Sequence, residues 1–307
     1  MNWLIIVSSE KSEAAKNAGN MLARHNVPMR IFVLPNGNSQ LALERLLQAL
    51  KNVTHCIIPD FDSIVSFNTT LFLLGFLQGR HITSFIQGTA NCYSNLVSSD
   101  SINYFESLDK LLGMVDVEFN NFEVLERRRI AYTSLFKAGI PFTTDCFASH
   151  IANDDAKECD LFLEAGMDVN SRDSNGTPMI CIAARSDKVD RIKWLLDNGA
   201  DINAVSKDRG YSATMDAVWK NNEDAVKALV TRGANLNFIS RDGQSVLVLA
   251  VGTGNAKVVE ILAKYGADPD IKDQMGMSAR QYAVLFKKPA MVESFEKYSS
   301  PKDDKTE

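Results

Sequence analysis

Glycine recurs at a fixed interval through the second half of this 307-residue chain. One series of glycines is spaced by 33, 34 and 33 residues, and a second by 34, 33 and 33. The first series is Gly166, Gly199, Gly233 and Gly266, and the second is Gly176, Gly210, Gly243 and Gly276. Two independent phases that agree over four units indicate a structural repeat, so this half is predicted to be a linear stack of similar units.

Each repeat carries two apolar segments separated by a polar break. In the first full unit, one segment runs from residue 179 to residue 184, and apolar side chains recur at Val189, Ile192 and Leu195. This spacing of three and four residues predicts helix, turn, helix. A glycine such as Gly233, just after the second helix, suits a left-handed backbone position, where a side chain would be strained.

Residues 176–203 and 210–237 match best the pattern G-x-T-P-L-H-x-A-A…G-A-D-x-N, and this half of the chain therefore resembles the ankyrin repeat. The Thr-Pro-Leu-His tetrapeptide is replaced, for example by Pro-Met-Ile-Cys at 178–181, which implies lower stability per repeat and the same fold. The resemblance implies about five units over residues 142–298, with degenerate first and last units. Residues 299–307 are expected to be a disordered tail.

The first half alternates short apolar runs with helical stretches. Strands are predicted at 3–7, 29–34, 55–58 and 82–86, and helices at 12–25, 39–50, 69–78 and about 107–119. Strands that alternate with helices predict a parallel sheet covered on both faces, so residues 1–120 are expected to form a flavodoxin-like α/β domain. A connecting helix is predicted within residues 121–141, where no Gly/Ser-rich spacer occurs, which favours a fixed orientation of the two halves.

Polar side chains follow two strands of the predicted sheet. Ser8, Ser9 and Glu10 come after the first strand, and Asp60 and Asp62 come after the third. Ligands of such sheets bind beyond the carboxyl ends of the strands, so these five residues are the candidate ligand-binding residues. No G-x-G-x-x-G or P-loop motif is present, and short acidic side chains equally serve loops and helix caps.

The segment 57–80 resembles the middle of TIR-like and nucleoside deoxyribosyltransferase-like domains. The resemblance implies a catalytic glutamate on the helix, but that position is about Leu73, and no Asp or Glu occurs from Ser63 through Ser99. Because glycosidic cleavage needs a carboxylate, we predict no catalytic residues in this domain. The alternatives are a nucleotide- or NAD-binding sensor, an N-glycosidase-type enzyme, and self-association, which the TIR-like resemblance implies.

Charge and composition limit the kinds of binding partner that we expect. Residues 1–140 hold 12 Lys/Arg and 12 Asp/Glu, and residues 141–307 hold 21 and 26, so neither half has the basic surface that nucleic acid requires. The five cysteines form no C-x-x-C pair, the four histidines lack ligand spacing, and the apolar runs are too short for a signal or a membrane span. We expect a cytoplasmic, bacterial protein with no metal, no cofactor and no membrane contact.

The leading hypothesis is a scaffold that binds another protein. Each repeat has a pair of small residues in its first helix, such as Ala183-Ala184 and Ala217-Val218. In the ankyrin resemblance, the residues just after each small-residue pair face the concave side of the stack, and an aromatic side chain there suits an interface. The candidate partner-binding residues are Arg185, Arg209, Tyr211, Trp219, Lys220 and Arg241. These positions are expected to pack nothing within the repeat. The alternative is that Trp219 folds over its own stack.

Overall fold

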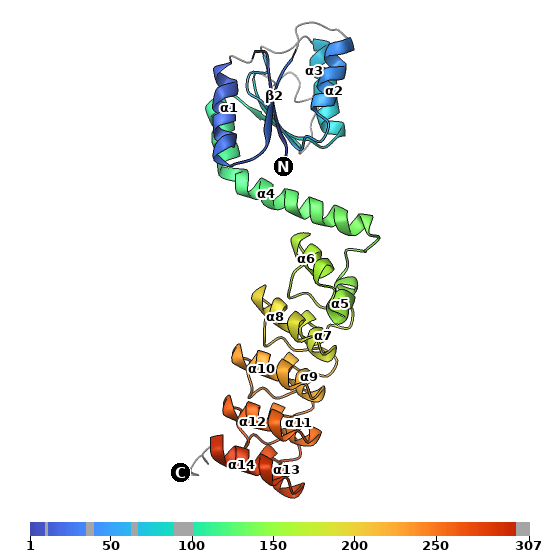
Figure 1. Ribbon diagram of the computed structural model, residues 1–307, viewed down its shortest axis with the longest axis vertical. Helices are drawn as coiled ribbons and strands as arrows, with labels where there is room; N and C mark the ends of the chain where they lie inside the picture. Colours follow the sequence, from blue (N-terminus) through green and yellow to red (C-terminus); the bar gives the residue numbers. More distant parts are fainter. Residues whose placement is uncertain (10–11, 35–39, 63–66, 89–100, 299–307) are drawn as a thin grey trace. The chain divides into compact units, whose positions relative to one another are not determined.

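The computed structural model describes residues 1–9, 12–34, 40–62, 67–88 and 101–298. The chain divides into two compact units, Met1–Glu126 and Arg127–Glu307 (Figure 1). Glu10, Cys92 and the predicted tail at 299–307 lie outside the described residues.

The first unit is built on a five-stranded parallel sheet. Its strands are β1 (Trp3–Val7), β2 (Met29–Val33), β3 (His55–Ile58), β4 (Thr83–Gln87) and β5 (Ile102–Phe105). They lie in the order β2-β1-β3-β4-β5, and Ile5 in the interior strand β1 is paired with Ile31 on one side and Ile57 on the other. The predicted parallel sheet is confirmed. Two faces of buried apolar side chains follow from the alternation along these strands.

Helices cover both faces of this sheet. They are α1 (Glu13–Arg24), α2 (Gln40–Ala49), α3 (Phe67–Gly79) and the first part of α4 (Leu108–Lys137). Leu46, Leu73 and Leu77 pack with one set of strand residues, and Leu22 and Leu111 pack with the other. In Figure 1, α1 lies on one side of the sheet and α2 with α3 on the other.

Two features of the first unit differ from the predictions. The strand β5 was not expected, because the polar Asn103 interrupts its four residues. The helix predicted at about 107–119 and the connecting helix predicted within residues 121–141 are the single helix α4, since the sequence between residues 119 and 123 contains no glycine or proline that would end a helix.

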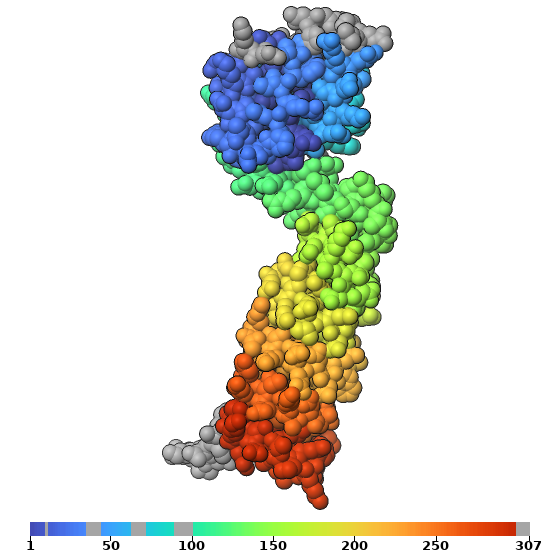
Figure 2. All heavy atoms as spheres, in the orientation of Figure 1, coloured from blue at the N-terminus to red at the C-terminus, as the bar shows by residue number. Residues whose placement is uncertain are grey.

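The second unit contains five helix pairs, as the repeat predicts. The pairs are α5 (Thr144–Asn153) with α6 (Ala156–Glu164), α7 (Met179–Arg185) with α8 (Val189–Asp197), α9 (Ala213–Trp219) with α10 (Glu223–Thr231), α11 (Val246–Thr253) with α12 (Ala256–Lys264), and α13 (Ala279–Leu285) with α14 (Pro289–Tyr298). Figure 2 shows the repeats as consecutive bands of colour, so each repeat packs against its neighbours in the sequence.

Local chemistry sets the ends of these helices and loops. All eight glycines of the two series have a positive φ. For the series that follows the second helix of each pair, such as Gly233, this confirms the predicted left-handed position. Ser212, Ser245 and Ser278 are N-caps whose side chains accept a hydrogen bond from a backbone N–H in the first turn of α9, α11 and α13. Each of these serines also pairs in an antiparallel bridge that closes the hairpin loop before its helix.

Candidate functional site

The first helices of three successive pairs and their hairpin loops surround a hollow of about 790 Å³. It is lined by Tyr211, Trp219, Asn221, Gln244, Val248, Leu249, Gly252, Thr253, Asp273, Met275, Tyr282 and Phe286. We call this hollow the aromatic groove. The 33-residue repeat produces it, because equivalent positions of α9, α11 and α13 fall on the same side of the stack.

Trp219 is the prominent exposed side chain of the aromatic groove. It is the last residue of α9, directly after the buried Val218, and it is 55% exposed. The guanidinium of Arg209, from the preceding hairpin loop, lies 5.9 Å from the centre of the Trp219 ring. Tyr211 is only 6% exposed and belongs to the wall of the groove. Trp219 therefore presents a large, rigid side chain to an open surface.

The far end of the groove was not predicted from the sequence. Tyr282 and Phe286, one helical turn apart on α13, stack with ring centres 5.6 Å apart, and the Tyr282 hydroxyl donates a 2.8 Å hydrogen bond to Asp273. This hydrogen bond raises the pKa of Tyr282. The spacing of these two aromatic residues, opposite Trp219 two repeats earlier, is the signal that could have identified them.

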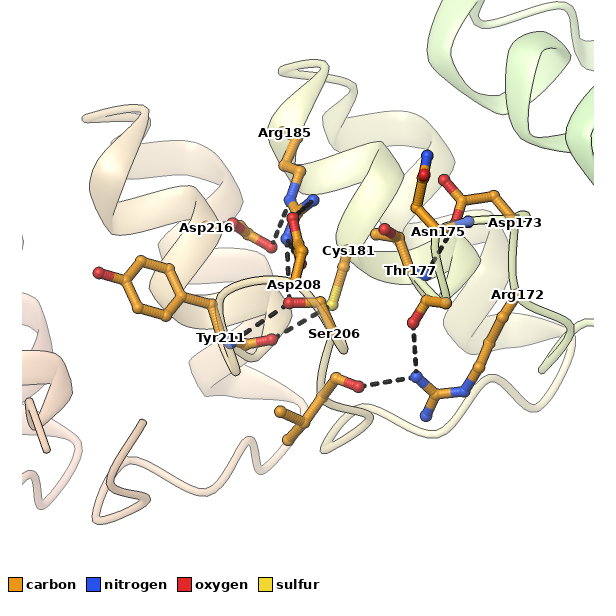
Figure 3. A network of polar contacts seen from close by, with 12 residues as sticks. Arg172, Asp173, Asn175, Thr177, Cys181, Arg185, Ser206, Asp208, Tyr211 and Asp216 are labelled. Atoms are coloured by element: carbon orange, nitrogen blue, oxygen red, sulfur yellow. Dashed lines mark hydrogen bonds and ion pairs between the residues drawn. The ribbon is translucent and has the colours of Figure 1, made fainter. Parts of the chain in front are cut away.

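Arg185, at the end of α7, is held by a polar network (Figure 3). Its Nε donates a 3.0 Å hydrogen bond to Asp216, its Nη1 and Nη2 donate to the two oxygens of Asp208 at 2.8 and 3.0 Å, and Nη2 also donates to the Ser206 hydroxyl. The bidentate contact with Asp208 is a strong geometry for a guanidinium. The network connects one repeat to the next.

The pKa values of the two carboxylates in this network are shifted in opposite directions. Burial raises the pKa of Asp216 to about 6, although Arg185 acts in the other direction. The hydrogen bonds from Arg185 hold the pKa of Asp208 well below its usual range. Within the described part of the chain, Oδ1 of the buried Asp216 has no hydrogen-bond partner.

The predicted partner-binding residues thus fall into two groups. Trp219, Arg209, Lys220 and Arg241 are exposed. Arg185 and Tyr211 differ from the expectation that such positions pack nothing within the repeats. The guanidinium of Arg185 is committed to Asp208, Asp216 and Ser206, and Tyr211 is 6% exposed and packs in the hydrophobic core of the repeats. The sequence did contain a signal, because an aspartate in the middle of the apolar helix α9 needs a cationic partner.

In the first unit, the candidate residues lie at one edge of the sheet. Because β1 and β3 are neighbours and parallel, Ser8, Ser9, Asp60 and Asp62 follow adjacent strand ends. The connections from β1 and β3 lead to opposite sides of the sheet, which makes this edge a topological switch point. Asp62 lies against the end of β4, since a Cβ added at Gly88 would be 2.9 Å from its Oδ1.

The position where the resemblance to glycosidic enzymes expects a glutamate is occupied by a buried leucine. Leu73 is fully buried among the side chains between α3 and the sheet. A side chain at this position therefore faces the core of the first unit.

The described residues offer few other groups for metal binding, membrane insertion or nucleophilic chemistry. They contain no group of three His, Cys, Asp or Glu side chains that could hold a metal ion, and no helix long and apolar enough to cross a membrane. Cys56, Cys159 and Cys181 are buried free thiols, and burial raises the pKa of Cys159 to about 12. Such thiols pack as small apolar groups and are poor nucleophiles.

The second unit is a stack of antiparallel helix pairs joined by hairpin loops, the architecture of a helical repeat protein. The family model for ankyrin repeats (3 copies) matches residues 146–240 and 214–299, which together make up half of the chain. The chain belongs to the ankyrin-repeat family.

Curated relatives share these repeats. The chain is 33% identical over 175 residues to an ankyrin repeat-containing protein of Treponema pallidum (strain Nichols), over 57% of this chain and 59% of that protein. It is 32% identical over 114 residues to the B-cell lymphoma 3 protein homolog of Mus musculus, over 37% of this chain and 25% of that protein. The chain thus spans less than two thirds of the length of these relatives.

Proposed function

We propose that this chain is a protein-binding scaffold. Its partner lies against the surface formed by the hairpin loops and the first helix of each pair, which we call the inner surface of the repeats. The observation that carries the proposal is the aromatic groove, where Trp219 is 55% exposed and lines the same hollow as Tyr282 and Phe286. Large aromatic side chains in a hollow are typical hot spots of protein interfaces. Arg209, Lys220 and Arg241 would add contacts around Trp219, and Arg185 would act by holding the neighbouring repeats in place.

Affinity capture from a cell lysate tests this proposal with a matched pair of variants. Trp219→Ala removes an exposed aromatic of the groove, and Tyr265→Ala removes an exposed aromatic at the end of the outer helix α12. We expect the Tyr265 variant to retain the captured proteins and the Trp219 variant to lose them, with both melting temperatures close to that of the wild type. Equal capture by both variants would contradict the proposal.

The first unit has a different proposed role. We propose a flavodoxin-like domain without catalytic activity, since its strand order is β2-β1-β3-β4-β5 and Leu73 replaces the expected carboxylate. The buried free thiols suit the reducing cytoplasm in which we place the protein. Incubation with NAD and deoxynucleosides should release no free base. Base release that Asp60→Ala or Asp62→Ala abolishes would overturn this view.

A second candidate function for this unit is the binding of a nucleotide. The observation that favours it is the switch point between β1 and β3, where Ser8, Asp60 and Asp62 lie at the same sheet edge. A thermal-shift screen of the full chain against nucleotides tests it, because a ligand at a hundredfold excess over its dissociation constant stabilises by about 2.7 kcal/mol. A shift that Asp60→Ala removes would support binding at this edge.

A further inference from the structure

Charge is unevenly distributed within the repeats. The segments 172–188, 205–221, 239–255 and 272–288, which hold the hairpin loops and the inner helices, contain 11 Lys/Arg and 6 Asp/Glu. The remaining residues of 141–307 contain 10 Lys/Arg and 20 Asp/Glu. The inner segments are therefore net positive, whereas residues 141–307 taken together are net negative.

Around the aromatic groove, exposed Arg and Lys side chains carry this excess of positive charge. Arg209 and Lys220 are exposed beside Trp219, and Arg241 is exposed on the next hairpin loop, where it lies against Gly210. Most of the carboxylates of the same segments are already engaged. Asp208 and Asp216 bind Arg185, and Asp273 accepts hydrogen bonds from the Tyr282 hydroxyl and from backbone amides.

We propose that the aromatic groove binds a segment of a partner protein that carries an apolar anchor side chain flanked by acidic residues. This inference rests on the proposed scaffold function and adds the chemistry of the partner. The anchor would fill the hollow between Trp219, Tyr282 and Phe286, where burial of apolar surface supplies the affinity. The flanking carboxylates would lie near Arg209 and Lys220, where complementary charge selects the partner.

A single-stranded nucleic acid also combines negative charge with flat rings, so it is the main competitor for such a groove. The charges of the unit as a whole favour the peptide. The twenty acidic residues outside the inner segments create a field that repels a long polyanion, whereas a peptide with a few carboxylates encounters mainly the local cations. We therefore assign the groove to an acidic peptide.

Selection from a random peptide library displayed on phage tests the assignment, with the full-length chain as bait. We expect the selected peptides to contain an aromatic or aliphatic residue near Asp or Glu. One selected peptide, synthesised with a fluorescent label, is then titrated against variants by anisotropy. Trp219→Ala and Lys220→Glu should each weaken binding by about tenfold or more. The first removes an aromatic wall of the hollow that holds the anchor, and the second reverses the charge that faces the flanking carboxylates.

Two control variants keep the test specific. Tyr265→Ala and Lys227→Glu change an exposed aromatic and an exposed cation on outer helices, and they should bind the peptide as the wild type does. Enrichment of basic or uncharged peptides, or tighter binding of a single-stranded DNA oligonucleotide than of the peptide, would overturn the assignment and leave the scaffold proposal standing. Selection of no peptide at all would contradict both.

Discussion

Arg185 and Asp216 are 31 residues apart in the sequence and form an ion pair with an N–O distance of 3.0 Å between α7 and α9. The Asp216 side chain is fully buried, and the Arg185 side chain is 23% exposed. Asp208, on the hairpin loop before α9, completes the site. One guanidinium thus joins a helix of one repeat to the loop and helix of the next.

Arg185→Ala is expected to lower the free energy of unfolding by about 3 kcal/mol or more, because it leaves the buried charge of Asp216 uncompensated. In an Asp216→Asn background, the same change should cost less, since no buried charge remains. Urea denaturation of the wild type, the two single variants and the double variant measures both losses of unfolding free energy. Arg232→Ala is the control, because its pair with Asp197 is exposed and should contribute less than about 1 kcal/mol. Equal costs in the two backgrounds would contradict a specific Arg185–Asp216 interaction.

Stability should depend on pH through Asp216. Its folded pKa of about 6 lies above its ordinary value, so the folded protein holds this proton more tightly than the unfolded chain does. The resulting stabilisation is complete below about pH 4 and is lost as the pH rises through about 6. The lowered pKa of Asp208 acts in the opposite sense, and its contribution is lost only as the pH falls below about 4.

The difference in unfolding free energy between the wild type and Asp216→Asn isolates this effect from other carboxyl groups. It should change by up to about 3 kcal/mol in favour of the variant as the pH rises from about 4 to about 7. Urea denaturation across this range measures it. A difference that does not vary with pH would show that Asp216 titrates normally.

Two glycines of the repeat should differ in their tolerance of a side chain. Gly233 has a φ of 83° with no atom within 4 Å of an added Cβ, so Gly233→Ala should cost about 1 kcal/mol from backbone strain alone. At Gly210, where φ is 69°, the added Cβ would lie 2.9 Å from the backbone nitrogen of Arg241 in the next repeat. Gly210→Ala should therefore lower the free energy of unfolding by clearly more than Gly233→Ala does. Thermal denaturation of both variants makes the comparison, and a neutral Gly233→Ala would contradict the left-handed conformation.

Two valines at equivalent positions of the last two repeats give a second matched pair of variants. Val251 and Val284 occupy equivalent positions of α11 and α13, but Val251 is 1% exposed and Val284 is 62% exposed because no described repeat follows α13. Val251→Ala should cost about 2 kcal/mol from lost packing, and Val284→Ala should stay within about 0.5 kcal/mol. Similar losses at both positions, measured by urea denaturation, would show that Val284 is covered in solution.

The repeats could be predicted from the sequence because their signals are local. A residue such as Gly233 needs a positive φ whatever surrounds it, and the small residues and serine caps recur with the same period. In the first unit, β5 and the continuity of α4 were missed, since their ends depend on packing that a short apolar pattern does not encode.

The candidate groove was predicted only in part. Exposure of Trp219 follows from its place after the small-residue pair of α9, and this could be read from the repeat alignment. For Arg185 the sequence signals only that Asp216 needs a cationic partner. Which residue supplies it depends on the folded stack, because Asp208 and Asp216 come from the repeat that follows Arg185.

Site-specific photo-crosslinking tests most directly whether the inner surface of the repeats is the partner-binding surface. A photoreactive phenylalanine analogue would replace Trp219 in one full-length protein and Tyr265 in another, and both would be irradiated in the same cell lysate. We predict covalent adducts with discrete partner proteins at position 219 and none above background at position 265. Adducts at 265 without adducts at 219 would place the partner on the outer helices and contradict the proposed function.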